Sequence, residues 1–465
     1  MSAAGRGAAP VLVGGAIRDG LLGRPSLDLD VAVPRAATET ARRTADRVGG
    51  AFVPLDGERD VARVIAAGFR LDIAAFRAAT LEGDLRARDY TINALAVSLP
   101  ELLRDGGAPI IDPSGGLADL RARRLRIPAP AALTDDPLRA LRGVRLESLL
   151  GFRLDRAAQR SIRAAAASVS NVSAERVRDE VIAMLALSRT GRTFRRLDAL
   201  SLLSVILPEV DAMRATAQPA PHRFDVLEHS LRAVEGVDRL GDSMAALAPF
   251  GDDLADHLSR EVAVDVQRWH TWKLAALLHD VAKPETRREV DGRIRFFEHD
   301  LLGADRVRAI GDRLRLPARV TALVERLVRH HLRPMHLEQA GEVTRRARYR
   351  FFRDLGEDAR DLLLLALVDA AAVTGESPLR TWRRASLIRD LLGGFAEAET
   401  IRAAPPLLTG DDVMRHFSIG PGPEVGRLLD RAREAQALGL IGSRDEALAF
   451  LDSPRTDPYS TRTRA

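Results

Sequence analysis

Cysteine is absent from all 465 residues of this chain. Disulfide bonds, thiol nucleophiles and zinc sites with thiolate ligands are therefore excluded. The chain also lacks an apolar run long enough to cross a bilayer, and its first residues do not show the basic-then-apolar pattern of a signal peptide. We therefore expect a cytoplasmic protein with no membrane partner.

Lysine is nearly absent as well. Lys273 and Lys283 are the two lysines, and arginine supplies the other 68 of the 70 basic residues. Arginine suits phosphate recognition because its planar guanidinium presents several donors in a fixed geometry. Residues 1–190 hold 28 arginines and 23 acidic residues, so the whole net charge of +5 lies in that part of the chain. An excess of this kind is expected where nucleic acid binds.

Histidine is missing from residues 1–221, since all ten histidines lie at or after His222. Chemistry in this part of the chain must therefore run without imidazole. This excludes a Ser-His-Asp triad there and favours metal-assisted transfer.

The stretch VLVGGAIRDGLLGRPSLDLDVAV, residues 11–33, predicts a strand, a glycine turn, a short helix and a second strand. Gly14 and Gly15 let backbone N–H groups approach a phosphate at the helix N-terminus, and Arg18 is placed to pair with a phosphate oxygen. Alternation along the second strand puts Asp28 and Asp30 on one face. Two carboxylates beside a phosphate site are what Mg²⁺-dependent phosphoryl transfer needs.

The ordered motif G-G-x-[VI]-R-D-x-L-L-G-R-x-x-x-D-x-D closely resembles the signature of the class II tRNA nucleotidyltransferases and the related bacterial poly(A) polymerases. The resemblance implies a polymerase-β-like head in which Asp28 and Asp30 hold Mg²⁺. A third carboxylate is expected on a neighbouring strand, and Asp72 in the predicted strand 69–76 is the candidate. Strands are also expected at 51–53 and 61–65, with a helix over 37–48. The implied activity is template-independent addition of CCA, from CTP and ATP, to the 3′ end of tRNA.

The segment DLRARDYTINALAV, residues 84–97, resembles the family motif R-R-D-x-T-I-N-A. By that resemblance Arg88 contacts the nucleotide, while Asp89 and Asn93 fix local turns. The first arginine of the motif is Ala87 here, and Arg86 could reach the same pocket instead. The preceding link, residues 78–83, is shorter than in members that build a complete CCA end, and it resembles members that add the two cytidines alone. Addition of CCA, addition of CC and poly(A) synthesis all stay open.

The segment TDDPLRALRGVRL, residues 134–146, predicts a helix opened by Pro137 with Asp135 or Asp136 as its cap. Cytosine and adenine each show an amino donor beside a ring-nitrogen acceptor, so a carboxylate next to a guanidinium selects them against uracil and guanine. Asp136 and Arg139 match the family's E-D-x-x-R template, and Arg142 and Arg145 would contact base or phosphates. A later helix, 173–185, carries Glu175, Arg176 and Glu180 of an E-R-x-x-x-E motif, for which a structural role is favoured, with Ser173 as its cap.

The second half resembles the HD phosphohydrolase superfamily, most clearly in HDVAKP at residues 279–284. Imidazole and carboxylate ligands from separate helices can converge on one divalent ion. The resemblance assigns His229, His279, Asp280 and Asp369 as ligands of Mn²⁺, Ni²⁺, Co²⁺ or Mg²⁺. His299 and His331 could complete a second metal site or bind phosphate, and His330 is the weaker candidate. An alternative hypothesis from a different functional class is a metal phosphohydrolase that keeps the first half of the chain only as an RNA-binding platform.

These segments predict a multidomain α/β and α protein. A nucleotidyltransferase head with a mixed sheet occupies 1–125, a helical neck 126–195, an all-α HD domain 196–400 and an RNA-contacting helical tail 401–465, with the last dozen residues disordered. The basic and aromatic stretch 345–353 is expected to pack as a helix. The tRNA 3′ end, CTP and ATP are the expected partners, and the oligomeric state stays open.

Overall fold

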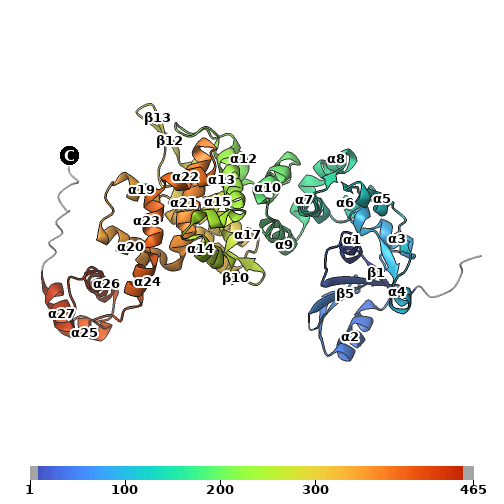
Figure 1. The fold of residues 1–465 in the computed structure, drawn as a ribbon, viewed down its shortest axis with the longest axis horizontal. Helices are drawn as coiled ribbons and strands as arrows, with labels where there is room; N and C mark the ends of the chain where they lie inside the picture. The colour runs from blue at the N-terminus through green and yellow to red at the C-terminus, as the bar shows by residue number, and fades with distance from the viewer. Residues whose placement is uncertain (1–8, 67, 454–465) are drawn as a thin grey trace, which may run out of the picture. The chain divides into compact units, whose positions relative to one another are not determined.

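The computed structural model describes residues 9–66 and 68–453, so the polar end that we expected to be disordered lies outside the described residues. The chain divides into two compact units (Figure 1). The first runs to Asp211 and includes Arg313–Arg315, and the second holds the rest of the chain from Ala212 onward. The finer division into four parts stays a prediction.

A seven-stranded sheet forms the head of the first unit, in the order β3-β4-β5-β2-β1-β6-β7. β2 and β5 are parallel, and the other neighbouring strands are antiparallel. Its strands are β1 Val11–Val13, β2 Asp28–Val33, β3 Ala51–Asp56, β4 Val61–Ala66, β5 Phe69–Ala75, β6 Ala96–Ser98 and β7 Ile110–Ile111. Its helices are α1 Gly15–Leu21, α2 Ala37–Val48, α3 Leu81–Arg86, η1 Thr91–Asn93, α4 Leu99–Asp105 and α5 Gly116–Arg121. The expected mixed-sheet head is therefore present, and α2 has the bounds predicted for it.

Strand alternation separates a packing face of this sheet from a functional face. Val31 and Val33 of β2 and Ile73 of β5 are buried in one cluster with the alanines of α2. Those alanines, Ala37, Ala41 and Ala45, recur every four residues and so share one side of the helix. The acidic positions of β2 and β5 have the opposite parity, so their side chains point away from α2.

Helices complete the first unit. They are α6 Ala132–Asp135, α7 Leu138–Leu150, α8 Arg156–Ala165, η2 Ala166–Asn171, α9 Ala174–Leu185, α10 Thr190–Ala199, α11 Leu203–Ile206 and α12 Glu209–Arg214, the last of which crosses the division between the units. A short parallel pair, β8 Arg124–Leu125 and β9 Arg153–Leu154, lies among them.

The start of α7 differs from the prediction. Asp135 belongs to α6, and Asp136 is extended because a residue before proline is driven out of the helical region. Pro137 then takes the N-cap position rather than the first helical turn. Asp136 Oδ1 does accept a hydrogen bond from the backbone N–H of Leu138 at 3.3 Å, whereas Ser173 stands at the N-cap of α9 without a side-chain cap bond.

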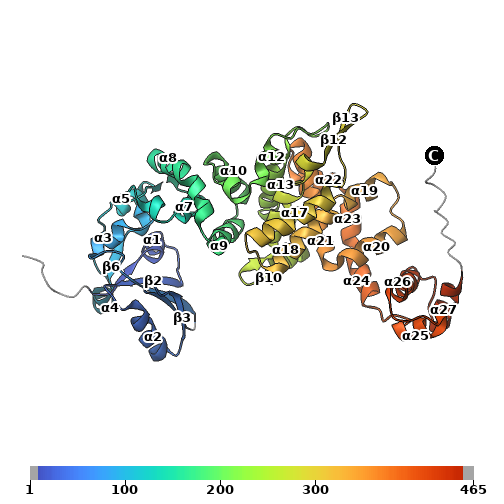
Figure 2. The same cartoon turned by 180° about the vertical axis from the view of Figure 1, so that it is seen from behind.

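The second unit is almost entirely helical (Figure 2). Its helices are α13 Val226–Gly241, η3 Met244–Leu247, α14 Gly251–Ser259, α15 Arg268–Leu278, α16 Lys283–Thr286, α17 His299–Arg313, α18 Ala318–His330, α19 Arg333–Gln339, α20 Arg345–Leu355, η4 Gly356–Asp358, α21 Ala359–Thr374, α22 Pro378–Arg384, α23 Ser386–Gly393 and α24 Phe395–Ala403. Two hairpins interrupt them, β10 Glu261–Ala263 with β11 Val266–Gln267, and β12 Arg287–Val290 with β13 Arg293–Phe296. α21 is buried along most of its length and supplies the centre of the helical core.

The tail helices are α25 Gly410–Phe417, α26 Pro423–Ala437 and α27 Arg444–Asp452. They bury a hydrophobic cluster of their own, which includes Val413, Ala435 and Leu451. The basic stretch 345–353 forms most of α20 and buries Phe351 and Phe352, as predicted. Among the described residues no single helix is both long and apolar enough to cross a membrane, although one bent pair, Arg345–Thr374 with Pro378–Arg384, meets the test by length and composition.

Candidate active sites

The first unit contains a cavity of about 1240 Å³ that opens on the functional face of the sheet. Every nucleotide-binding residue predicted from the sequence lines it: Gly14, Gly15, Arg18, Arg88, Asp89, Asp136, Arg139, Arg142 and Arg145. Asp30 and Asp72 line it as well, while Asp28 does not. Residues separated by more than 130 positions in the sequence thus meet around one space.

The glycine turn brings the backbone close to a carboxylate. Gly14 has φ +76°, and a Cβ there would lie 2.8 Å from Oδ2 of Asp30. Glycine is therefore required both for its conformation and for the space. Arg18, one turn into α1, is almost fully buried and donates to Oδ1 of Asn93 at 2.7 Å. Asn93 thus holds the guanidinium of Arg18 at the cavity wall.

The three predicted catalytic carboxylates stand on the neighbouring parallel strands β2 and β5. Asp30 lies opposite Asp72 in the register, and Asp28 lies opposite Arg70. Arg70 binds Asp28 at 2.6 Å, and Arg63 of β4 binds Asp72 through two hydrogen bonds of 2.7 and 2.9 Å. Two of the three carboxylates are thus held by arginines in this structure.

Asp30 differs from these two because no arginine is bonded to it within the described residues. Burial raises the pKa of Asp30; Arg88 opposes that shift, and the nearby carboxylates Asp72 and Asp89 add to it. A divalent cation would favour the ionised form of such a carboxylate. An all-oxygen donor set from aspartates suits Mg²⁺, so the residues present fit this ion.

The segment after α3 fixes one side of the cavity. Asp89 Oδ1 accepts hydrogen bonds from the Tyr90 backbone at 2.7 Å and from the Asn93 amide at 3.1 Å, as the predicted turn role requires. Arg88 pairs with the buried Asp84 at 3.1 Å and lines the cavity. The expectation that Arg86 could replace the missing arginine at position 87 is wrong. Arg86 is exposed, lies 3.6 Å from Glu82 and is not among the residues that line the cavity.

The base-reading pair is arranged more loosely than its spacing suggested. Arg139 and Asp136 approach only to 3.9 Å. Asp136 Oδ2 accepts instead from Nη2 of Arg176 at 2.8 Å, and Arg139 donates to the backbone carbonyl of Ala132 at 3.0 Å. Burial would raise the pKa of Asp136, but the hydrogen bond and charge of Arg176 outweigh it and lower this pKa. Asp136 is therefore an ionised acceptor, and each of its oxygens has a second lone pair for a base.

A partly buried network of ion pairs lies at the same cavity as this pair. Glu180 of α9 accepts from Arg142 at 3.2 Å and from Arg145 at 2.7 Å, and Arg142 also binds Asp89 at 3.3 Å. Burial opposes the charged form of Arg142, but Asp89 and Glu180 outweigh it and raise the pKa of Arg142. From the sequence, the charges of the E-R-x-x-x-E motif were expected to stabilise helix ends. In the structure they support the cavity instead, since Arg176 holds Asp136 and Glu180 holds Arg142 and Arg145 of α7.

Arg63 and Arg70 of this site were not assigned a role from the sequence, and Arg176 was assigned only a structural role in its own helix. Arg63 could have been found by aligning the antiparallel strands β4 and β5, in which it lies opposite Asp72. Arg70 could have been found by aligning β5 with β2, in which it lies opposite Asp28. Arg176 comes from a helix 40 residues away, and no local pattern relates it to Asp136.

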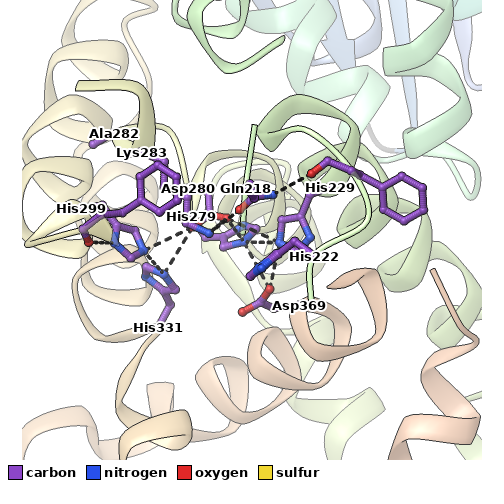
Figure 3. A network of polar contacts seen from close by, with 12 residues as sticks. Gln218, His222, His229, His279, Asp280, Ala282, Lys283, His299, His331 and Asp369 are labelled. Carbon is purple, nitrogen blue, oxygen red and sulfur yellow. Dashed lines mark hydrogen bonds and ion pairs between the residues drawn. The ribbon is translucent and has the colours of Figure 1, made fainter. Parts of the chain in front are cut away.

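In the second unit, the predicted HD residues converge on one buried centre (Figure 3). Two groups each bring their ligand atoms within 4.8 Å of one another: His229 with His279 and Asp369, and Asp280 with His299 and His331. These are the groups of metal-ligating side chains that are this compact within the described residues. All six side chains predicted for this centre are therefore brought together, and His330 is in neither group.

Asp280 connects the two groups. Its Oδ2 lies 3.2 Å from Nε2 of His279, while its Oδ1 lies 3.4 Å from Nε2 of His299. The imidazole Nε2 atoms face each other in pairs, 3.1 Å apart between His229 and His279 and 3.2 Å apart between His299 and His331. A carboxylate with one oxygen toward each pair is suited to bridge two cations, so the donor set fits a divalent metal centre.

Backbone carbonyls orient three of the imidazoles. Nδ1 of His279, His299 and His331 lies 3.0, 2.8 and 2.6 Å from the carbonyl oxygens of Ala276, Phe296 and Val328. Because a carbonyl oxygen can only accept, each Nδ1 carries the hydrogen and each Nε2 is left toward the centre.

Electrostatics distinguish the two groups. Burial would lower the pKa of His279, but Asp280 and Asp369 outweigh it and raise the pKa to about 10. Burial, together with the charges of His279 and His299, lowers the pKa of His331 to about 3.

The sequence also gave no role to Lys283, whose Nζ donates to Asp280 Oδ2 at 2.7 Å and to Oε1 of Gln218 at 2.8 Å. Its spacing from Asp280, three residues along the chain, was the available signal.

Three family models match the chain. Residues 11–126 match the poly A polymerase head domain, residues 151–214 a probable RNA and SrmB-binding site of polymerase A, and residues 226–371 the HD domain. The predicted head and HD domain are thereby confirmed.

Curated relatives match over nearly the whole chain. An A-adding tRNA nucleotidyltransferase of Deinococcus radiodurans is 37% identical over 447 residues, which cover 95% of this chain and 94% of the relative. A CC-adding tRNA nucleotidyltransferase of Thermus thermophilus is 37% identical over 451 residues, covering 94% and 92%. A multifunctional CCA protein of Neisseria gonorrhoeae is 31% identical over 339 residues, covering 69% and 73%.

Solved structures share the fold. A CCA-adding enzyme without ligand superposes with a TM-score of 0.63 at 19% identity, covering 96% of this chain and 91% of that one. The Thermotoga maritima CCA-adding enzyme complexed with tRNA gives a TM-score of 0.57 at 20% identity, covering 95% and 90%. With relatives of 37% identity along almost its full length, this chain belongs to the tRNA nucleotidyltransferase and poly(A) polymerase family.

Proposed function

We propose that this protein adds nucleotides of the CCA end to the 3′ end of tRNA from nucleoside triphosphates, with CTP as the donor of the two cytidines. The observation that carries the proposal is the single cavity that gathers the glycine turn, Asp30, Asp72 and the base-reading pair Asp136 and Arg139. The names of the relatives support the same substrate. Such substrates are found in the cytoplasm, which is where we place the activity.

In the proposed reaction the 3′ hydroxyl of the tRNA attacks the α-phosphate of the incoming nucleotide, and pyrophosphate leaves. The backbone N–H groups at Gly14 and Gly15, with Arg18, would hold the triphosphate. Arg88 would contact it too, since Nη1 of Arg88 lies beside the glycine turn, 3.5 Å from the position of a Cβ at Gly14. Asp28, Asp30 and Asp72 would hold Mg²⁺, which supplies charge neutralisation at the phosphate and lowers the pKa of the attacking hydroxyl. The aspartates bonded to Arg63 and Arg70 must exchange these partners when the ion binds.

The test is incubation of tRNA that lacks its CCA end with each nucleoside triphosphate alone and in pairs. Incorporation from CTP supports the proposal. A long adenylate ladder from ATP alone would identify a poly(A) polymerase. No incorporation from any nucleotide into this tRNA, and none from ATP into tRNA that ends in CC, would leave the head as an RNA-binding platform.

Product length is a second question, and the link before α3 favours a stop after two cytidines. This link is short and ordered: the Arg77 N–H donates to Asp84 Oδ1 at 3.0 Å, and Thr80 caps α3 by accepting from Gly83 at 3.1 Å. A Cβ at Gly83 would lie 2.8 Å from that of Ala78, so the turn has no spare room. A link held in this way limits the reshaping that would let one pocket take ATP after two cytidines.

We therefore expect tRNA that ends at the discriminator base to gain two residues when CTP and ATP are both present. Sequencing-gel resolution of the product length measures this outcome. Three added residues would contradict the two-cytidine product and would support the complete CCA addition expected from the sequence.

The base-reading pair carries a prediction about nucleotide choice. Arg139→Ala should lower CTP incorporation and reduce the preference for CTP over UTP, by roughly 10²-fold, because a buried polar edge of the base loses its partner. The ratio of kcat/KM for the two nucleotides is the measurement. Arg160→Ala, an exposed arginine of α8, is the matched control, and an unchanged ratio in Arg139→Ala would reject the assigned role.

The centre in the second unit favours a second function, metal-dependent phosphohydrolysis. His229, His279, Asp280 and Asp369, with His299 and His331, would hold one or two divalent ions, for which Mn²⁺, Ni²⁺, Co²⁺ and Mg²⁺ are the candidates. Such ions supply a nucleophilic water at neutral pH. Water would attack phosphorus and the P–O bond to the leaving hydroxyl would break, while Lys283 is placed to neutralise charge beside Asp280. Release of phosphate from monoesters, or opening of 2′,3′-cyclic nucleotides, tests this function.

A further inference from the structure

An arginine-rich hairpin connects two residues of the HD centre. β12 and β13 lie between Lys283, which is bonded to Asp280, and His299. Asp291 and Gly292 at the turn have φ +52° and +67°, the conformation that closes a two-residue hairpin tightly. In Figures 1 and 2 the hairpin stands out from the helices of its unit. We call residues 287–296 the arm.

One face of the arm carries arginines without carboxylates. The register pairs Arg288 with Arg295 and Val290 with Arg293, so these four side chains share one face. All four are exposed, while Ile294 and Phe296 on the other face are partly buried. The acidic side chains of the arm are Glu289, which lies on the face of Ile294, and Asp291 at the turn.

This arrangement is unfavourable for the arm alone. Like charges placed directly opposite each other on a sheet are destabilising, as Arg288 and Arg295 are here. Within the described residues Arg293 and Arg295 have no ion-pair partner, and Arg288 donates only to the backbone carbonyls of Glu285 and Arg287. An anion bound across this face would relieve the repulsion.

The spacing of the arginines fits a phosphodiester chain. Arg293 and Arg295 are two residues apart on one strand, and strand geometry separates their Cα atoms by roughly 7 Å. That separation is comparable with the distance between successive phosphates in an extended single strand. The guanidinium of arginine binds phosphate oxygens through several N–H donors in a fixed geometry. Arg293 and Arg295 are therefore spaced to bind neighbouring phosphates.

An exposed aromatic residue stands where the arm meets the centre. Phe297 is 59% exposed and follows β13 directly, two residues before His299. The preceding residue, Phe296, anchors the base of the arm, because its ring lies 5.5 Å from Lys283 Nζ and its carbonyl accepts from His299. Aromatic faces beside arginines are the combination that binds single-stranded nucleic acid, by stacking and by backbone contacts.

We propose that the arm binds the backbone of a single-stranded RNA end and presents its terminal phosphate to the HD centre. The proposal rests on the phosphohydrolase function proposed above and narrows its substrate to RNA termini over free nucleotides. Arg288, Arg293 and Arg295 hold the phosphates, and Phe297 stacks on a base near the terminus.

The test uses an arm variant that carries both Arg288→Ala and Arg295→Ala. It is compared with a matched control. The control is Arg319→Ala with Arg383→Ala, two exposed arginines of the same unit that give the same change of charge. The substrates are an oligoribonucleotide that ends in a 2′,3′-cyclic phosphate and free 2′,3′-cyclic AMP. We expect the KM for the oligonucleotide to rise about tenfold or more in the arm variant, with kcat and cyclic AMP hydrolysis unchanged. Phe297→Ala, which keeps the charge, should raise the same KM at least about fivefold.

A second measurement tests RNA binding by the arm independently of hydrolysis. For binding of the same oligonucleotide without metal, the slope of log Kd against log salt should flatten by about 1.4 in the arm variant, close to 0.7 for each arginine lost. If the wild type hydrolyses neither substrate, the hydrolase function fails, and the salt slope alone decides whether the arm binds RNA.

Three outcomes would overturn the proposal. The first is a slope and KM equal to those of the control. The second is an equal rise in KM for cyclic AMP, which would mean that the substitutions disturb the centre itself. The third is displacement of the RNA by polyglutamate of the same charge at the same concentration, which would make the arm a binder of acidic protein.

Discussion

Asp28→Ala and Asp30→Ala should each abolish nucleotide addition, with kcat/KM reduced at least about 10³-fold, while the protein stays folded. The expected size follows from the several kcal/mol of charge stabilisation that a catalytic cation supplies, at 1.36 kcal/mol for each factor of ten. Incorporation of radiolabelled CTP into tRNA lacking its CCA end measures the loss. Asp30 should be the more severe position because it lines the cavity beneath the glycine turn.

A matched control is available in the same domain. Asp46 is an exposed carboxylate on α2, behind the sheet, and Asp46→Ala should keep full activity. Since Asp28 binds Arg70 in this structure, circular dichroism and thermal unfolding must show that the variants remain folded. Addition retained by either folded variant in Mg²⁺ would reject the assigned metal site.

The head could be predicted well because its signals are local. Alternation on one strand placed Asp28 and Asp30 on the same face, and the helix predicted over residues 37–48 is α2 with the same bounds. The family resemblance indicated Asp72 on a neighbouring strand, and the structure adds the parallel register that sets it opposite Asp30. Periodicity of two and of 3.6 residues needs no knowledge of tertiary structure, so these elements were within reach.

The contacts of the side chains were harder to predict because they are long-range. The sequence placed Asp136 and Arg139 side by side as a base-reading pair. It did not indicate that Asp136 would bond to Arg176 from a different helix. Arg86 looked equivalent to the missing arginine at position 87, but it lies at the C-terminal end of α3 and points to Glu82. Successive residues of a helix are rotated by about 100° around its axis, so an arginine at position 86 cannot reach the pocket that a residue at position 87 would face.

The ligands of the HD centre could be predicted from the sequence, but their arrangement could not. Its ligands were recognised one by one at the ends of apolar helices, and the structure brings all six together. The sequence could not indicate that Asp280 directs one oxygen to each group, because this depends on how α13, α15, α17, α18 and α21 pack. The arginine face of the arm also depends on hairpin register, which is set by the turn at Asp291 and Gly292.

The two proposed activities should be separable by substitution. His279→Ala with Asp280→Ala removes a ligand from each group of the HD centre, so metal-dependent release of phosphate should be lost while nucleotide addition continues at its normal rate. Each unit has its own cavity or centre, built from its own residues. A matched control is His336→Ala with Glu338→Ala, an exposed histidine and acid on α19.

Folding of this variant needs its own check, since Asp280 is buried and holds the ammonium group of Lys283. Leaving a buried charge without its partner costs about 3–5 kcal/mol, so the double variant should unfold at a lower temperature. Asp369→Asn is the second test, because Asp369 is more exposed than the other five ligands and keeps its shape as asparagine. Assays of both activities, with and without EDTA, complete the comparison. If folded Asp369→Asn loses nucleotide addition along with hydrolysis, the two sites are not independent, and if the wild type releases no phosphate from monoesters, cyclic nucleotides or RNA ends, the centre has only a structural role.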